Sequence, residues 1–266
     1  MENTSVPISS IRVGTSGFSY ADWVGPFYPP GTRPAAMLPW YARHFDALEI
    51  NFTYYRLPAP GQLEAMSARC AGRVTFAVKA WQGMTHTGEA STADIAAFTS
   101  ALAPLSERGV LGAVLLQFPG SFRPSAAANR RLVELASRLR PFPIVAEFRH
   151  RSWVREETFR LLRTEGVGFC CVDEPELLGL IPPVAVATAD TAYVRFHGRN
   201  AGKWFQHEQP HERYDYLYGI DELAAWVPRL RQLDAAAART LVFMNNHYEA
   251  KAVTNARQLK ELLAVG

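Results

Sequence analysis

IVAEFRHRSWVREETFRLLRTEGVGFCCVDE, residues 144–174, shows the structural unit on which the chain is organised. Two short runs rich in β-branched and aromatic residues, 144–150 and 168–174, have the composition of strands. The segment between them, 153–164, spaces its apolar residues as a helix does, with Ser152 placed to cap its start and Gly166 to end it. Strands that alternate with helices pair in parallel, so this stretch predicts a strand–helix–strand unit.

The same alternation continues through the rest of the chain. Six further strand-like runs lie at residues 11–17, 47–55, 75–80, 112–119, 192–198 and 240–246. Segments with helical spacing lie at residues 60–70, 92–105, 126–139, 219–233 and 250–263, and Ser125 is placed to cap the third of these. Eight strands within 266 residues predict a single (β/α)8 TIM barrel with parallel strands, one domain over residues 1–266 with its core at about 11–263. An open nucleotide-binding sheet is the alternative, but GTSGFSY at residues 14–20 lacks the G-x-G-x-x-G pattern.

The overall composition argues against several classes of protein. The chain has 28 basic and 25 acidic residues, and its net charge of +3 is too small to indicate a nucleic-acid-binding protein. No apolar run approaches the ~18 residues of a membrane-spanning helix, and MENTSVPISS at the start lacks the pattern of a signal peptide. Three cysteines without a C-x-x-C pair indicate neither a disulfide framework nor a zinc ribbon, so we expect a cytoplasmic protein with reduced thiols.

Polar and charged residues end the strand-like runs from the second to the eighth. Alternate residues of a strand share a face, and TIM-barrel active sites lie at the carboxyl ends of the strands. We therefore expect eight side chains to point into one cavity: Glu49, Lys79, Gln117, Glu147, Arg149, Asp173, Arg195 and His197. Asn51 and Asn245 lie at the ends of the second and eighth runs and join the candidate site.

The charges of this set are balanced, with three carboxylates against three cations. Any one of these residues has a purely structural explanation, because strand ends close to loops are often hydrated. Burying several ions for stability alone is costly, however, so the whole pattern favours an ion-pair network that organises a site for a polar or anionic ligand. The three cations argue against a cluster of metal ions, which surplus carboxylates and imidazoles would normally surround.

Two further signals are weaker. The letters H-E-x-x-H occur from His207 to His211, but Pro210 and the polar flanks disfavour the helix that a zinc-protease motif needs, so we predict no zinc there. Aromatic residues in the predicted loops either stack on a ligand or form lids packed on the barrel. They are Tyr20, Trp23, Trp81, Trp204 and Tyr214.

Seven blocks in order along the chain resemble the YecE-like family, a domain of unknown function numbered seventy-two in its series. They are GTSGFSYADWVGPFYPP, LEINFTYYRLP, FAVKAWQGMTH, LLQFPGSF, AEFRHRSW, YVRFHGR and VFMNNHYEAKAVTNA. The resemblance extends from residue 11 to residue 263 and implies a TIM barrel, but it implies no reaction. The residues that match the family's motifs are Trp23, Glu49, Asn51, Tyr55, Arg56, Lys79, His86, Gln117, Glu147, Arg149, Trp153, Asp173, Arg195, His197, Gly198, Trp204 and residues 245–247.

Three functions are compatible with these residues. The first is a metal-independent enzyme without a cofactor that acts on a small polar or anionic, sugar-phosphate-like molecule by acid/base chemistry. Its catalytic residues would be Glu147 or Asp173 as the base, His197 as the proton donor, Lys79 to bind or polarise the anion, and Glu49. Its substrate-binding residues would be Asn51, Gln117, Arg149, Arg195, Asn245, Trp204 and His86.

The other two functions differ in kind. One is a metal-dependent hydrolase or isomerase, including a nuclease, with Glu49, Glu147, Asp173 and His197 as metal ligands. The other is a barrel that binds a ligand without catalysis. Metal analysis of the protein separates the metal-dependent enzyme from the other two.

The loops after the seventh and eighth strands form a candidate anion site. TIM barrels often hold phosphate at these loops and at a nearby helix N-terminus. Here Gly198 permits close backbone approach, and Arg195 and Arg199 supply cations near residues 245–247. The alternative explanation is that Asn246 caps the last helix and that Arg195 pairs with Asp173.

Overall fold

The computed structural model describes residues 10–265 and contains a closed barrel. Its strands all run parallel and pair in chain order, and the last strand pairs with the first. The strands are β1 (Ile11–Ser16), β2 (Ala47–Ile50), β3 (Thr75–Lys79), β4 (Leu111–Gln117), β5 (Ile144–Glu147), β6 (Val167–Asp173), β7 (Thr191–Phe196) and β8 (Arg239–Met244). The predicted TIM barrel is confirmed.

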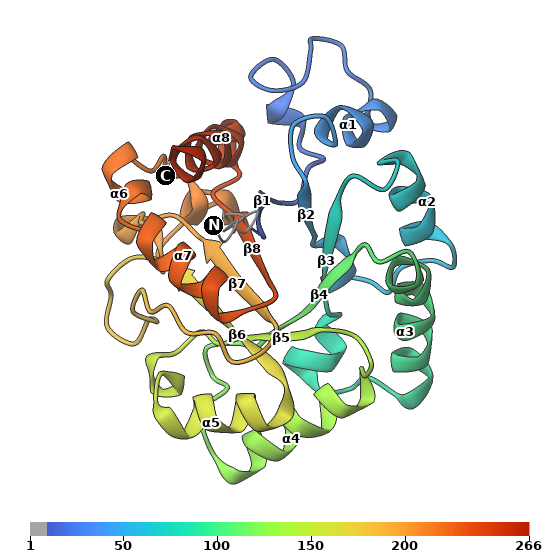
Figure 1. Ribbon diagram of the computed structural model, residues 1–266, viewed down its shortest axis with the longest axis vertical. Coiled ribbons are helices and arrows are strands. Elements are labelled where there is room, and N and C mark those ends of the chain that lie inside the picture. Colours follow the sequence, from blue (N-terminus) through green and yellow to red (C-terminus); the bar gives the residue numbers. More distant parts are fainter. Residues whose placement is uncertain (1–9, 266) are drawn as a thin grey trace, which may run out of the picture.

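A ring of helices surrounds the strands (Figure 1). They are α1 (Pro34–Tyr41), α2 (Gln62–Arg69), α3 (Thr92–Glu107), α4 (Ala126–Arg138), α5 (Glu156–Glu165), α6 (Ile220–Ala224), α7 (Val227–Ala236) and α8 (Lys251–Ala264). The single helix expected at residues 219–233 is two helices, α6 and α7. Residues 174–190, all of them described, connect β6 to β7 without a helix, so this unit of the barrel is irregular.

The helix ends agree with two of the three predicted caps. The Ser125 hydroxyl accepts a hydrogen bond from the Ala128 N–H at 3.0 Å, and Gly166 ends α5 with a φ of 62°. The predicted cap at Ser152 is wrong, because α5 begins three residues later, after Arg155. Ser152 lies instead in a short 3₁₀ turn, where the buried ring of Trp153 packs on the barrel.

The second strand is shorter than the sequence pattern predicts. It ends at Ile50, and the chain then turns through a 3₁₀ helix at Phe52–Tyr54. The Thr53 hydroxyl donates to the backbone oxygen of Lys79 at 2.6 Å, which ties this turn to the end of β3. Asn51, Tyr54 and the chain that follows therefore lie over the mouth of the barrel instead of continuing its wall.

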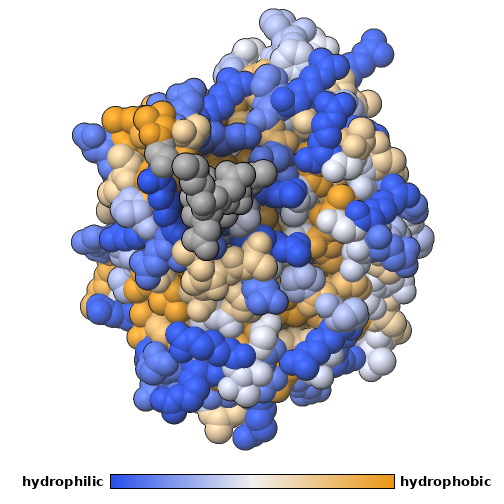
Figure 2. All heavy atoms as spheres, in the orientation of Figure 1, coloured by the Kyte–Doolittle hydropathy of each residue, from blue (hydrophilic) through white to orange (hydrophobic). Residues whose placement is uncertain are grey.

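Apolar side chains fill the barrel below the charged strand ends. The rings of Tyr193 on β7 and Phe243 on β8 lie 5.1 Å apart and are both fully buried. On the outside of the molecule, hydrophilic side chains cover most of the face in Figure 2, and apolar ones gather at its upper left, over α6. Among the described residues, no helix is both long and apolar enough to cross a membrane.

Candidate active site

Arg195 on β7 lies at the centre of a buried ion-pair network. Its side chain is almost completely buried, and it donates from Nη1 to Glu147 Oε2 at 2.6 Å and from Nη2 to Glu49 Oε1 at 2.7 Å. The second oxygen of Glu49 accepts a hydrogen bond from the Tyr193 hydroxyl at 2.6 Å. Since β2, β5 and β7 contribute one ion each, the network ties opposite sides of the barrel together.

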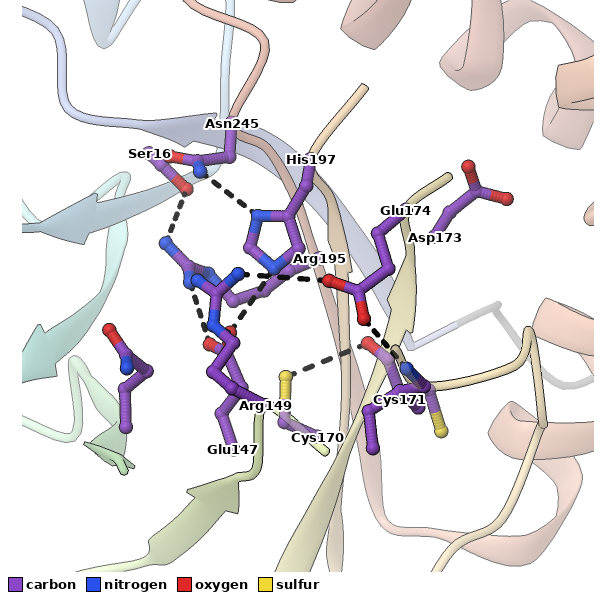
Figure 3. A network of polar contacts seen from close by, with 12 residues as sticks. Ser16, Glu147, Arg149, Cys170, Cys171, Asp173, Glu174, Arg195, His197 and Asn245 are labelled. Carbon is purple, nitrogen blue, oxygen red and sulfur yellow. Dashed lines mark hydrogen bonds and ion pairs between the residues drawn. The ribbon is translucent and has the colours of Figure 1, made fainter. Parts of the chain in front are cut away.

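A second layer of contacts surrounds Glu147 (Figure 3). Its Oε1 forms an ion pair with Arg149, 2.8 Å from Nε, and lies 3.2 Å from His197 Nε2. The other ring nitrogen of His197, Nδ1, lies 3.0 Å from Asn245 Nδ2. Because Asn245 Nδ2 is a donor, Nδ1 accepts and Nε2 carries the proton that it shares with Glu147.

The protonation states follow from these contacts. Burial and the Arg149 guanidinium lower the pKa of His197 to about 3, so this imidazole is neutral. Burial opposes ionisation of Glu147, but Arg149 and Arg195 hold the pKa of its carboxyl well below the usual value. Glu147 is therefore an anion that contacts two arginines and His197, an arrangement suited to fixing cations in place rather than to accepting a proton.

A cavity of about 410 Å³ opens above this network at the carboxyl ends of the strands. Seven residues of the predicted site line it: Glu49, Asn51, Lys79, Gln117, Arg149, Arg195 and Asn245. Glu147 and His197 lie behind this lining and are fully buried. Two buried polar atoms at the cavity hydrogen-bond to no described residue, Asn51 Oδ1 and Arg195 Nε. A buried donor and a buried acceptor that lack a protein partner call for an explanation, and here both belong to residues that line the cavity.

Lys79 differs from the other charged groups of the cavity. It ends β3, and its Nζ lies 4.2 Å from the centre of the Tyr54 ring. It makes no ion pair or hydrogen bond through its amine with any residue in the described part of the chain. Burial and the positive charge of Arg195 lower the pKa of Lys79 to about 7, although Glu147 attracts the charged form. At neutral pH the amine is present in both protonation states.

A second cavity of about 410 Å³ adjoins the first. The two cavities share lining residues, including Lys79, Gln117 and Arg149. The remaining predicted site residues, His86 and Trp204, line this second cavity. His86 packs its ring against Tyr54 with centroids 5.0 Å apart, and burial together with the charge of Lys79 lowers the pKa of His86 to about 4.

Asp173 does not point into the cavity, and its expected orientation is wrong. Its carboxylate accepts from Arg199 at 2.8 and 2.6 Å, from the Tyr218 hydroxyl at 2.8 Å and from Trp226 Nε1 at 2.7 Å. In the pairing of β6 with β7, Val172 lies opposite Arg195, so Val172 faces inward and Asp173 faces the helices.

Glu174, the residue directly after β6, contributes a carboxylate to the interior that the sequence pattern did not predict. Its Oε2 lies 3.7 Å from Arg149 Nη1, and its Oε1 accepts from the Ile181 N–H at 2.8 Å (Figure 3). Burial raises the pKa of Glu174 to about 7, although Arg149 opposes this. The apolar run before Asp173 has no alternation from which its inward face could be predicted.

The anion site expected at the loops after β7 and β8 is not supported by the contacts there. Arg199 is engaged by Asp173 and Glu222, and the Gly198 N–H donates to the Tyr218 hydroxyl at 2.8 Å. The alternative is also wrong in both parts. Arg195 pairs with Glu49 and Glu147 rather than with Asp173. Asn246 donates to Tyr216 and Asn255 rather than capping α8, whose N-cap is Ala250.

The two histidines of the H-E-x-x-H letters have separate partners. His207 Nδ1 lies 3.1 Å from the backbone oxygen of Lys203, and the His211 ring stacks on Tyr248 with centroids 4.5 Å apart. Within residues 10–265, no three His, Cys, Asp or Glu residues are grouped so that they could hold a metal ion. That no zinc binds at His207 and His211 stays a prediction.

Known proteins match this chain over nearly its full length. A sequence model of the family described as "Protein of unknown function DUF72" matches residues 12–266. The chain belongs to the DUF72 family. This confirms the family to which the seven sequence blocks pointed.

Members of the DUF72 family with solved structures share this fold. A DUF72 family protein from Thermotoga maritima MSB8 is 40% identical, with a TM-score of 0.87 over 96% of this chain and 99% of its own. One from Enterococcus faecalis V583 is 26% identical, with a TM-score of 0.86 over 96% of each chain. The chain is also 30% identical to the UPF0759 protein YunF of Bacillus subtilis (strain 168), over 96% of this chain and 95% of YunF.

Further residues of this DUF72 cavity come from the loops. Four tyrosines and a histidine are among them, namely Tyr20, Tyr54, Tyr55, Tyr214 and His247. Tyr20 and His247 stack in parallel with ring centroids 4.6 Å apart, which joins the first loop to the last. Tyr54 and Tyr55 were assigned to the second strand from the sequence, and the early end of β2 at Ile50 places them at the cavity instead.

Proposed function

We propose that this protein is a metal-independent enzyme that acts on a small polar or anionic molecule, with Lys79 as the group that transfers protons. One observation carries the proposal. Lys79 places an amine with no ion-pair partner among the described residues in a cavity that Arg149 and Arg195 also line. A general acid/base works best when its pKa is close to the working pH, and the pKa of Lys79 is about 7.

The rest of the cavity has a supporting role. Arg149 and Arg195 are held by Glu147 and offer positive charge to a carboxylate or phosphate of the substrate. Asn51 and Gln117 supply amide groups that can orient hydroxyl or carbonyl oxygens. Glu147 and Asp173, the bases expected from the sequence, are replaced in this role by Lys79, because both carboxylates are occupied by arginines.

The donor set supports a reaction without a metal. Two of the four groups considered as metal ligands, Glu49 and Glu147, are each bound to Arg195. A third, Asp173, faces the helices on the other side of the barrel wall. Carboxylates that already neutralise buried arginines are poor ligands for a further cation, because binding it would free those arginines.

The test compares consumption of metabolites by three proteins. The parent, Lys79→Met and the control Lys260→Met are treated with a chelator, desalted and incubated with a mixture of small metabolites that is followed by mass spectrometry. We expect the parent and the control to deplete the same anionic compound and Lys79→Met to deplete it at least 100-fold more slowly. Depletion that survives in Lys79→Met, or that needs a restored divalent metal, would contradict the proposal. Retention without conversion would indicate a ligand-binding barrel.

A further inference from the structure

Lysine is rare in this chain, and one of its lysines lies in the cavity. Of the 28 Lys and Arg residues, four are lysines, at positions 79, 203, 251 and 260. Arginine does not lose its proton in proteins, whereas the pKa of a lysine shifts readily when the amine is buried. A lysine at the cavity therefore provides what an arginine could not, an amine that can become neutral.

The four lysines have different environments. Lys203 pairs with Glu212 at 2.8 Å, Lys251 pairs with Asp215, and Lys260 lies 3.8 Å from Asp46. These carboxylates favour the charged ammonium form, which has no lone pair with which to attack a substrate. Lys79 has no such carboxylate contact among the described residues, and its Nζ lies over the Tyr54 ring, 4.2 Å from the ring centre.

Lys79 is also accessible to a ligand. It lines both adjoining cavities, so a molecule in either one reaches the end of β3. Arg149 lines both cavities as well, and Arg195 lines the first. The two arginines would hold an oxyanion on the same molecule that presents its reactive carbon to the amine.

We propose that the Lys79 amine forms an imine with a small aldehyde or ketone that also carries a carboxylate or phosphate, an inference that rests on the proposed function. The neutral amine attacks the carbonyl carbon, a C–N bond forms, and the carbonyl electron pair moves to oxygen, which takes up a proton released by the new ammonium. The carbinolamine hydroxyl then takes up a proton from solvent, which replaces the one that the ammonium gave up to become the neutral amine, and it leaves as water while the nitrogen lone pair forms the C=N bond. Overall, an ammonium and a carbonyl give a protonated imine and one water.

The amine has the required protonation state in this position. With its pKa lowered to about 7, the Lys79 amine can become neutral near pH 7, whereas an ordinary lysine is almost entirely charged there. The protonated imine retains the positive charge of the ammonium, so the balance with Glu49 and Glu147 is unchanged. The positive imine also draws electrons from the neighbouring carbon, which makes a C–H or C–C bond there easier to break.

Reductive trapping tests the inference. The intact protein is incubated with pyruvate, dihydroxyacetone phosphate or uncharged acetone, reduced with sodium borohydride, and analysed by intact mass and peptide mapping. We expect a single adduct on Lys79. At least one of the two anionic probes should form it at a concentration ten times lower than the concentration of acetone that is needed. The comparison of pyruvate with dihydroxyacetone phosphate distinguishes a carboxylate site from a phosphate site. Labelling should rise through pH 7.

Matched variants make the result specific. The adduct should disappear in Lys79→Arg and persist in Lys203→Arg and Lys260→Arg. Labelling spread equally over the four lysines, or absent from Lys79 between pH 6 and 9, would overturn the imine. The proposed function fails separately, if metabolite depletion survives in Lys79→Met or if NMR of the lysine side chains shows Lys79 charged up to pH 9. If the Lys79 amine titrates near pH 7 but forms no adduct, the imine is rejected while the proposed acid/base function is not.

Discussion

Asp173 and Glu174 are consecutive residues at the end of β6, and their carboxylates lie on opposite sides of the barrel wall (Figure 3). Asp173 bonds to Arg199, Tyr218 and Trp226 among the outer elements, whereas Glu174 lies 3.7 Å from Arg149 in the interior. The Asp173 carboxylate therefore attaches the barrel to the elements that surround it. The Glu174 carboxylate instead contributes its charge close to the cavity.

Replacing Asp173 should affect stability rather than chemistry. Asp173→Ala leaves the buried donors of Tyr218 and Trp226 without this acceptor and removes one of the two carboxylates that pair with the half-buried Arg199, so we expect a loss of about 3–5 kcal/mol in the free energy of unfolding. Urea unfolding measures the loss, and turnover per folded molecule should be unchanged. A stable but inactive Asp173→Ala protein would instead return Asp173 to the catalytic set.

Glu174→Gln should change how stability depends on pH. The pKa of Glu174 is raised to about 7 from 4.5, so between these values the folded chain binds more protons than the unfolded chain. The parent therefore loses stability at this residue as the pH rises from about 4.5 to 7. We expect Glu174→Gln to gain roughly 1 kcal/mol or more relative to the parent between pH 5 and pH 8. Urea midpoints at the two pH values provide the measurement, and a constant difference would show that the carboxyl ionises normally.

Lys79→Met should stabilise the protein while it removes activity. Because the pKa of Lys79 falls to about 7, the unfolded chain binds more protons than the folded chain between pH 7 and 10.5. The penalty of burying the charged amine is complete below pH 7 and disappears as the pH rises to 10.5. We expect a gain on the order of 1–3 kcal/mol at pH 6 that shrinks towards pH 10.

Denaturant unfolding at pH 6, 8 and 10 checks this prediction. The Lys260→Met variant, which changes a half-buried lysine outside the cavity, is the matched control and should show no such trend. If Lys79→Met were less stable than the parent at pH 6, the charged amine would be contributing favourable contacts rather than a cost.

His197 should remain neutral over the whole working range. Its pKa of about 3 and its contacts with Glu147 and Asn245 predict a proton fixed on Nε2. Nitrogen NMR of the imidazole should show one tautomer with no titration between pH 5 and 9. A titration near pH 6 to 7 would make His197 the proton donor that the sequence suggested.

Much of the site could be predicted from local pattern. Glu147 and Arg149 lie two residues apart at the end of a strand, and they meet as expected at 2.8 Å. Arg195 and His197 have the same spacing, and both contact Glu147. The prediction failed where the pattern carried no alternation, in the apolar run before Asp173, and where β2 ended early.

Local patterns in the sequence are sufficient to predict an eight-stranded parallel barrel with a mixed set of charges at its strand ends. Strand alternation and helical spacing are local properties, so they can be recognised without knowing which segments meet. Which carboxylate neutralises which arginine depends on the tertiary structure, and so does the lack of an ion-pair partner for the Lys79 amine among the described residues. Lys79, Arg149 and Arg195 come from three different strands, and electrostatic energy depends on their separation and on exclusion of water. Folding sets both the separation of the charges and the exclusion of water. From the sequence, Lys79 was expected to bind or polarise an anion, whereas its position in the folded barrel supports the acid/base role proposed for it.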